Sequence, residues 1–238
     1  MPAKHHRTVD RVVTILEVVA RSASGLTLTE LAQELEAAKS SVQELTNGLV
    51  ATGYLIEDRK RYRLGPGPYV LTLAGQRSPA RLVGHDDLVA LAERTGTIAL
   101  LAIRLGDAFV YVDETAVNGR IDFYARSRRR RPLLRAAAGR VILADLDPAE
   151  RDDLLRTLED SRPDDVDRFL RELPGILERG YAVTHEESVP GIHAIAAPLH
   201  DRQGRFLAAI TLTVESDGDL IDSLGPELLA TIEEWRAR

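Results

Sequence analysis

Polar side chains that can hydrogen-bond to nucleotide bases gather on one face of the helix expected after Ala38. At 3.6 residues per turn they lie roughly 180° from the apolar residues Val42, Leu45 and Leu49. Such a face fits the roughly 12 Å major groove of DNA, where short polar groups can read base edges. The DNA-contacting residues predicted on this helix are Lys39, Ser40, Ser41, Gln43, Glu44 and Asn47.

A cationic turn, Asp58-Arg59-Lys60-Arg61, follows this helix and joins two short strands expected over residues 54–56 and 62–64. Cations at a hairpin tip beside a base-reading helix suit contacts to the phosphate backbone. We therefore predict phosphate contacts for Arg59, Lys60 and Arg61. The alternative is an ordinary three-helix packing domain with a charged turn. The order of helix, helix and basic hairpin favours nucleic-acid binding.

Two further clusters contain residue types that can bind metals or anions. His185-Glu186-Glu187, with His193 and His200, offers imidazole and carboxylate groups that suit a divalent metal. Strand alternation puts His193 on a different face from Ala194, however, and nothing in the sequence fixes His185 beside it, so no metal site is predicted. The run Arg128–Arg131 offers an anion or nucleic-acid patch, but is interpreted as a solvated strand end or a subunit contact.

Enzyme chemistry finds little support in the spacing of residues. No Ser-His-Asp arrangement, pair of catalytic carboxylates or nucleotide-binding loop emerges. Gly65-Pro66-Gly67 lacks the strand-to-helix setting of a phosphate loop and is interpreted as a hinge. We expect no enzyme activity and no cofactor. The alternative is a metabolite-binding module or enzyme whose winged domain serves protein contacts.

The elements that must position the base-reading helix have strong local signals. Thr27 and Glu30 have the spacing of a capping box, and Leu26 and Leu31 that of a hydrophobic staple, so a helix is expected to start here. Its buried face is predicted at Leu28, Leu31, Ala32 and Leu35. An earlier helix, preceded by the cationic arm Lys4-His5-His6-Arg7, is predicted to bury Val9, Val12, Val13, Leu16, Val19 and Ala20.

Composition limits the classes of protein to consider. The 238 residues are 44% hydrophobic, enough for a substantial core, and they include no cysteine, which excludes disulfides and thiol chemistry. No apolar run approaches the roughly 20 residues of a membrane span, and no signal peptide is recognisable, so we expect a cytoplasmic protein. Residues 1–78 hold 10 Lys and Arg against 8 Asp and Glu, a balance of +2, whereas the remainder holds 21 against 29, a balance of −8. This asymmetry favours a nucleic-acid-facing N-terminal part.

Glycine and proline residues that break secondary structure divide the chain near residue 78. We expect a winged helix-turn-helix domain over residues 1–65, a linker over 66–78 and a second domain over 79–238. Strands and helices of the second domain predict an α+β fold with an antiparallel sheet. Its expected helices are residues 79–95, 134–146, 148 onward, 166–179 and 226–236, and its expected strands are 97–104, 108–114, 121–127, 181–186, 192–200 and 205–215.

Several strings, in order, give nearly the whole chain a resemblance to the IclR family of transcriptional regulators: VDRVVTILEVVA, LTLTELAQEL, AKSSVQELTNGLVATGYL, RYRLGPG, RPLLRAAAGRVILADL, ILERGYAVTHEE and GIHAIAAPLHDRQGRFLAAITLTVES. The resemblance implies a winged helix-turn-helix domain, a linker helix and a GAF-like effector-binding domain. It also implies a homodimer or tetramer that binds double-stranded operator DNA as a repressor and responds to a small organic acid or aromatic effector.

The resemblance further implies an effector pocket between the helix after the arginine run and the last strands. Carried over by motif, its residues are Ala137, Ala138, Thr184, Ile192, Ala194, Thr211 and Thr213. Thr211 and Thr213 alternate onto one face of a strand, where two hydroxyls can hold a carboxylate; the alternative is that they are simply good strand formers. Two departures affect DNA recognition: Glu44 stands where the family usually has a cation, and Ala37-Ala38 where a proline is common.

Overall fold

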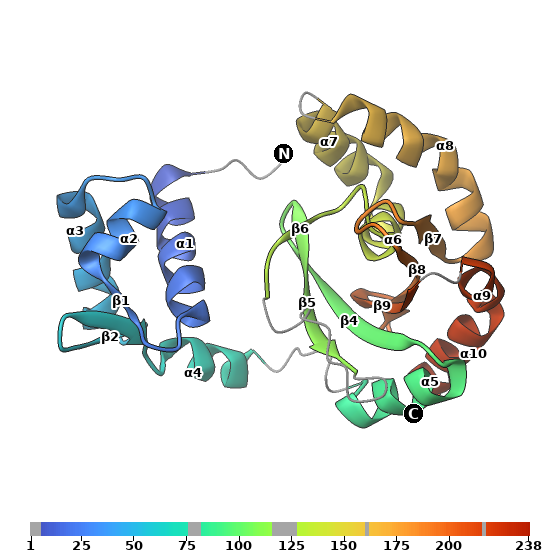
Figure 1. The fold of residues 1–238 in the computed structure, drawn as a ribbon, viewed down its shortest axis with the longest axis horizontal. Helices are drawn as coiled ribbons and strands as arrows, with labels where there is room; N and C mark the ends of the chain where they lie inside the picture. Colours follow the sequence, from blue (N-terminus) through green and yellow to red (C-terminus); the bar gives the residue numbers. More distant parts are fainter. Residues whose placement is uncertain (1–5, 76–81, 116–127, 160–161, 216–217) are drawn as a thin grey trace. The chain divides into compact units, whose positions relative to one another are not determined.

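The computed structural model describes residues 6–75, 82–115, 128–159, 162–215 and 218–238 (Figure 1). Contacts divide the chain between residues 77 and 78 into two units. Among the described residues, the N-terminal unit has one apolar core and the C-terminal unit has two. No helix in the described ranges combines the length and apolar character that crossing a membrane requires.

The N-terminal unit combines helices with a small antiparallel sheet. In chain order its elements are α1 (Arg7–Arg21), β1 (Leu26–Thr27), α2 (Leu28–Glu34), α3 (Lys39–Ala51), β2 (Leu55–Asp58), β3 (Arg61–Leu64) and α4 (Gly67–Ala74). The sheet has the order β1-β3-β2, so the wing is three-stranded where the sequence predicted two strands. The added strand β1 pairs Leu26 with Tyr62 and Thr27 with Arg61, which ties the wing to the start of α2.

The predicted capping box at the start of α2 is confirmed. The Thr27 amide donates to Glu30 Oε2 at 2.7 Å, and the Glu30 amide donates to Thr27 Oγ1 at 3.3 Å. The predicted buried stripe of α1 is confirmed in part, because Val19 is buried and Val12 and Leu16 pack against the core, whereas Val9 and Ala20 are exposed. Ile15, outside the predicted stripe, is also buried.

The C-terminal unit is built on an antiparallel sheet. Its elements are α5 (His85–Thr95), β4 (Ile98–Leu105), β5 (Ala108–Glu114), β6 (Arg131–Pro132), α6 (Ala137–Asp145), α7 (Pro148–Glu159), α8 (Pro163–Arg179), β7 (Ala182–His185), β8 (Ile192–His200), β9 (Phe206–Glu215), α9 (Gly218–Ser223) and α10 (Gly225–Ala237). The strands follow the order β6-β5-β4-β9-β8-β7, and every described pair is antiparallel.

Two helical layers cover opposite faces of this sheet. Successive residues of one strand, such as Leu100 and Leu101 on β4, belong to different cores. One core packs against α6, α7 and α8, and the other against α5, α9 and α10 (Figure 1). The predicted α+β fold with an antiparallel sheet is therefore confirmed.

Several predicted boundaries were wrong. The helix expected from residue 79 begins at His85, because the Gly84 amide donates to Asp87 Oδ2 at 3.0 Å and forms its N-cap. Helix α8 begins at Pro163 rather than at Val166, and α9 was not predicted. The strand expected over residues 121–127 lies outside the described residues.

Helix α6 begins at Ala137, three residues later than predicted. Residues 131–136 instead form β6 and a turn that packs directly on the helix. A Cβ on Gly139 would lie 2.0 Å from the Leu133 carbonyl oxygen, so only glycine permits this close approach.

Candidate functional site

The polar face predicted on α3 is exposed. Lys39, Ser40, Gln43, Glu44 and Asn47 all face solvent, whereas Val42 and Leu49 are buried and Leu45 is half-buried. Ser41 is half-buried, and its Oγ accepts a hydrogen bond from Arg11 Nη1 at 3.3 Å. Arg11, which the sequence reasoning missed, therefore fixes α1 to the first turn of α3.

The tip of the wing holds two exposed cations in an uncommon backbone conformation. Arg59 and Lys60 have φ values of 49° and 64°, as in a type I′ hairpin turn, where Asn-Gly is the usual choice. A side chain in this left-handed region costs roughly 1 kcal/mol or more. The hairpin nevertheless presents Arg and Lys side by side at its end.

Arg61, the third predicted phosphate contact, is engaged within the unit. Its Nη1 donates to the Gly25 carbonyl oxygen at 2.8 Å and lies 3.5 Å from Glu30 Oε2. Glu30 therefore serves both the capping box of α2 and the first residue of β3. Hydrogen bonds from the Thr27 amide and hydroxyl, with the nearby Arg61 charge, hold the pKa of Glu30 below its ordinary value despite an opposing desolvation cost.

A small cavity in the C-terminal unit lies among the sheet, the start of α6 and the loop between β7 and β8. Its lining is Leu100, Tyr111, Arg131, Ala136, Ala137, Thr184, Ser188, Val189, Ile192, Ala194 and Thr213. The cavity is small, with about 30 Å³ of space open to the centre of a water molecule. Five of the seven residues carried over for the effector pocket line this cavity.

The other two carried-over residues, Ala138 and Thr211, are fully buried and do not line the cavity. Thr211 lies opposite Leu100 and Ala196 in the neighbouring strands. Its buried Oγ1 has no hydrogen-bond partner among the described residues.

Arg131 is the charged residue that the sequence reasoning missed in this cavity. It begins β6, opposite Phe109, and its guanidinium lies 5.5 Å from the centroid of the Tyr111 ring. The arginine run was the available signal, but its interpretation as a solvated strand end is wrong for Arg131, which lines the cavity. At the same cavity, α6 begins at Ala137, and its N-cap residue Ala136 offers no side-chain cap. Its first amides are therefore available to a polar group.

His185 and His193 lie side by side, which the sequence did not predict. His185 lies directly opposite His193, and their Nδ1 atoms are 3.0 Å apart. Asp222 and Glu186 face the remaining nitrogens of His185 and His193 at 3.3 Å and 3.7 Å. Within the described ranges, no group of three or more His, Asp or Glu side chains has a metal-binding arrangement.

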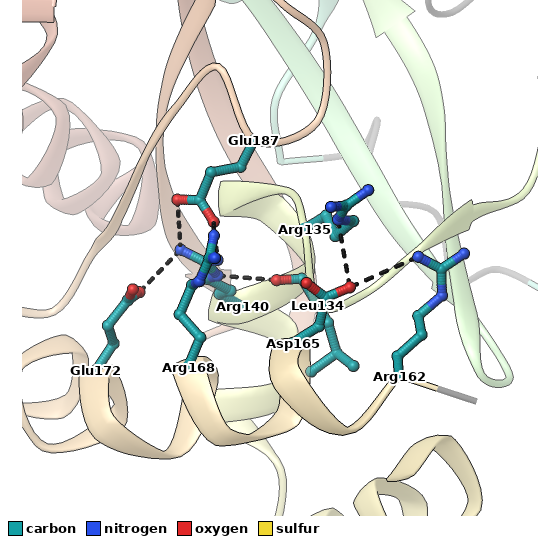
Figure 2. A network of polar contacts seen from close by, with 8 residues as sticks. All are labelled: Leu134, Arg135, Arg140, Arg162, Asp165, Arg168, Glu172 and Glu187. Carbon is teal, nitrogen blue, oxygen red and sulfur yellow. Dashed lines mark hydrogen bonds and ion pairs between the residues drawn. The ribbon is translucent and has the colours of Figure 1, made fainter. Parts of the chain in front are cut away.

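A second charged cluster centres on Arg140 of α6 (Figure 2). Its Nε donates to the Leu134 carbonyl oxygen at 2.9 Å, and its Nη1 donates to Glu172 at 2.8 Å and to Glu187 at 3.1 Å. Nη2 also donates to Glu187, which accepts a further bond from Arg168 at 2.7 Å. Burial opposes ionisation of Glu187, but hydrogen bonds from Arg140 and Arg168 outweigh it and keep the pKa of this carboxyl below its ordinary value.

Both units match known protein families. Residues 8–59 match the IclR helix-turn-helix domain, and residues 80–235 match the family described as bacterial transcriptional regulator IclR C-terminal. The HTH-type transcriptional regulator BhcR of Paracoccus denitrificans is 32% identical over 215 residues, which cover 87% of this chain and 77% of that protein.

Solved structures share the fold. An IclR transcriptional regulator from Alicyclobacillus acidocaldarius has a TM-score of 0.72 and 25% identity, with 98% of this chain and 99% of that chain covered. An IclR homolog from Microbacterium hydrocarbonoxydans complexed with 4-hydroxybenzoate has a TM-score of 0.71 over 97% of this chain and 99% of that chain. At 20% identity, the latter likeness shows the fold alone.

Proposed function

The chain belongs to the IclR family of bacterial transcriptional regulators, and we propose that it binds operator DNA through α3 and the wing and responds to a small molecule held in the cavity of its C-terminal unit. The observation that carries the DNA half of the proposal is the exposed polar face of α3 in a unit whose wing ends in two exposed cations. Regulation by binding requires no catalysis, and we propose that the chain is not an enzyme and acts in the cytoplasm.

In this proposal α3 enters the major groove, where Gln43, Glu44 and Asn47 face the base edges. Lys39 and Ser40, at the first turn of the helix, contact phosphates together with Arg59 and Lys60 at the wing tip. Arg61 adds positive charge near the DNA phosphates while its Nη1 keeps its hydrogen bond to the Gly25 carbonyl oxygen. Ser41 is held by Arg11 and fixes the helix that reads the bases.

The proposed effector is a small organic acid, with or without an aromatic ring. The Arg131 guanidinium and the first amides of α6 favour a carboxylate, because charge-assisted hydrogen bonds are the strong ones. Hydroxyls of Thr184, Thr213 and Ser188 supply further hydrogen bonds, and Tyr111 supplies an aromatic wall. The Microbacterium relative, complexed with 4-hydroxybenzoate, supports this ligand class.

A homodimer or tetramer is proposed on the character of α4. Tyr69, Val70, Leu71 and Leu73 of this helix are each more than half exposed. Exposed apolar residues that gather in this way mark interaction surfaces. A second copy of the chain would cover them and would also place two copies of α3 on two half-sites of the operator.

A mobility-shift titration tests the DNA proposal, with a duplex from upstream of the protein's own coding sequence and a scrambled duplex of equal length. We expect preferential binding of the upstream duplex. Lys60→Ala should weaken binding to both and reduce the slope of log K against log salt by about one. Arg202→Ala, on an exposed turn of the C-terminal unit, is the matched loss of charge and should change neither quantity. Equal binding to both duplexes, or an unchanged salt slope in Lys60→Ala, contradicts the proposed interface.

A further inference from the structure

Arg140 is a fully buried cation whose hydrogen bonds reach three separate segments. Only 1% of its side chain is exposed, so its charge must be compensated by nearby acceptors. Those acceptors are the Leu134 carbonyl oxygen, the Glu172 carboxylate on α8 and the Glu187 carboxylate in the loop of residues 186–191 (Figure 2). The guanidinium thus connects the turn before α6, helix α8 and this loop.

Two of these segments are walls of the proposed effector cavity. The turn that carries Leu134 continues into Ala136 and Ala137, and the loop that carries Glu187 continues into Ser188 and Val189; all four of these neighbours line the cavity. Leu134, two residues before one wall, and Glu187, directly before the other, are therefore both bound to the Arg140 guanidinium.

The loop has few other polar ties. Among the described residues, its remaining hydrogen bonds stay within residues 186–192: the Glu186 amide donates to Ile192, the Ile192 amide to Val189, and the Gly191 amide to the Glu186 carboxylate. Glu187 is the loop residue whose side chain hydrogen-bonds to helices, through Arg140 of α6 and Arg168 of α8.

We propose that Arg140 is a positioning residue of the effector site, which holds the 186–191 loop as a wall of the cavity through Glu187. The proposal rests on the effector cavity proposed above. The cavity is small, so the position of its walls determines what it can hold. The loop is the wall whose carboxylate, Glu187, is bound by Arg140 of α6 and Arg168 of α8. The strands and α6 are part of the packed core.

Hydrogen–deuterium exchange on the full-length protein tests the proposal without a ligand. Glu187→Gln keeps the shape of the side chain and removes its charge. Losing hydrogen bonds between charged groups should accelerate exchange of the amides in residues 186–192 by at least about tenfold. Peptides from β9 should exchange at the wild-type rate.

Glu172→Gln is the matched control, because it removes one carboxylate from the same guanidinium but leaves the loop attached. It should change loop exchange by less than about twofold. Equal acceleration in the two variants, unchanged loop exchange in Glu187→Gln, or acceleration throughout the unit would overturn the positioning role. If Glu187→Gln does not fold, Arg168→Gln is the variant to test, because it removes the more exposed of the two arginines that bind Glu187. Accelerated exchange confined to residues 186–192 is again the expected result.

A ligand arm separates this inference from the proposed function. With 4-hydroxybenzoate or benzoate as the probe, protection of wild-type residues 186–192 that weakens at least about tenfold in affinity in Glu187→Gln supports both. A localised exchange effect without any ligand protection leaves the loop attachment standing and argues against an aromatic acid as the effector.

Discussion

Glu44 is an acidic residue on the face of α3 that we propose to enter the groove. Its carboxylate is exposed, and the phosphates nearby would oppose it unless it accepts a hydrogen bond from a cytosine amino group. We expect Glu44→Gln to lose about 1–3 kcal/mol of discrimination at one base position while non-specific binding improves slightly. Binding-site selection on wild type and variant measures this. Identical sequence preferences would show that Glu44 reads no base, and in that case Glu44→Arg should tighten binding to every duplex and steepen its salt dependence.

Thr211 and Thr213 share a strand face but differ in surroundings. Thr213 lines the cavity, whereas the Thr211 hydroxyl is buried without a described hydrogen-bond partner. Because an unsatisfied buried hydroxyl is costly, Thr211→Val should raise the free energy of unfolding of the C-terminal unit by about 1 kcal/mol. Urea titration measures it. Thr213→Val is the comparison, and there the stability should change little while effector affinity falls about tenfold or more. A destabilised Thr211→Val would mean that its hydroxyl is satisfied.

The ends of elements divide into those that neighbouring residues determine and those that distant ones do. The helix start predicted at Thr27 and Glu30 and the helix ends predicted at residues 95 and 179 are confirmed, because capping is local chemistry. Gly96 and Gly180 cap those two ends in the left-handed conformation. Helix α6 has no side-chain cap, and its start depends on the turn packed against Gly139. Strand β1 exists because its residues pair with Tyr62 and Arg61, more than thirty positions away. Neither a capping signal nor a hydrophobic period predicts either contact.

Gly139 and Gly175 offer a matched pair of helical glycines. A Cβ at position 139 would collide with the Leu133 backbone, whereas a Cβ at position 175 meets nothing within 4 Å. Gly139→Ala should therefore lower the free energy of unfolding by about 1–3 kcal/mol or more, as overpacking does. Gly175→Ala should raise it by up to about 1 kcal/mol, because alanine is the better helix former. Thermal unfolding monitored by circular dichroism compares them, and equal shifts would contradict the close approach at Gly139.

Acid should weaken the N-terminal unit through the capping box of α2. The Thr27 hydrogen bonds hold the pKa of Glu30 below its ordinary value. A carboxyl with a depressed folded-state pKa contributes stability that is present above its unfolded pKa of about 4.3 and is lost as pH falls through the folded value. The N-terminal unit should therefore lose stability below about pH 4.3. In Glu30→Gln this loss should be smaller, and an identical pH profile in urea unfolding would remove the capping box as its cause.

At the scale of the molecule, the sequence predicted the order of the units and the antiparallel sheet. The hydrophobic period and the glycine and proline breaks that indicate them extend over long stretches of the chain. The cavity was harder to predict. Its predicted residues lie on α6 and the last strands, while Arg131 and Ser188 come from a two-residue strand and a loop. Arg140 appears in the sequence as one more helical cation. Its burial follows from acceptors at Leu134, Glu172 and Glu187, which only the folded chain brings together.

Assembly through α4 gives a prediction for the whole molecule. Leu71 and Leu73 are 57% and 61% exposed, so replacing both with Ser should leave the unfolding of each unit nearly unchanged. If a second copy covers them, the double variant should shift sedimentation toward the monomer and weaken operator binding, because one half-site contact then loses the support of the other. Thr72→Ala, on the same exposed helix, is the control and should retain the wild-type sedimentation. Unaltered sedimentation of the Leu71→Ser, Leu73→Ser variant would place the subunit contact elsewhere. Weakened DNA binding without a change of assembly would instead assign α4 to the DNA-binding unit itself.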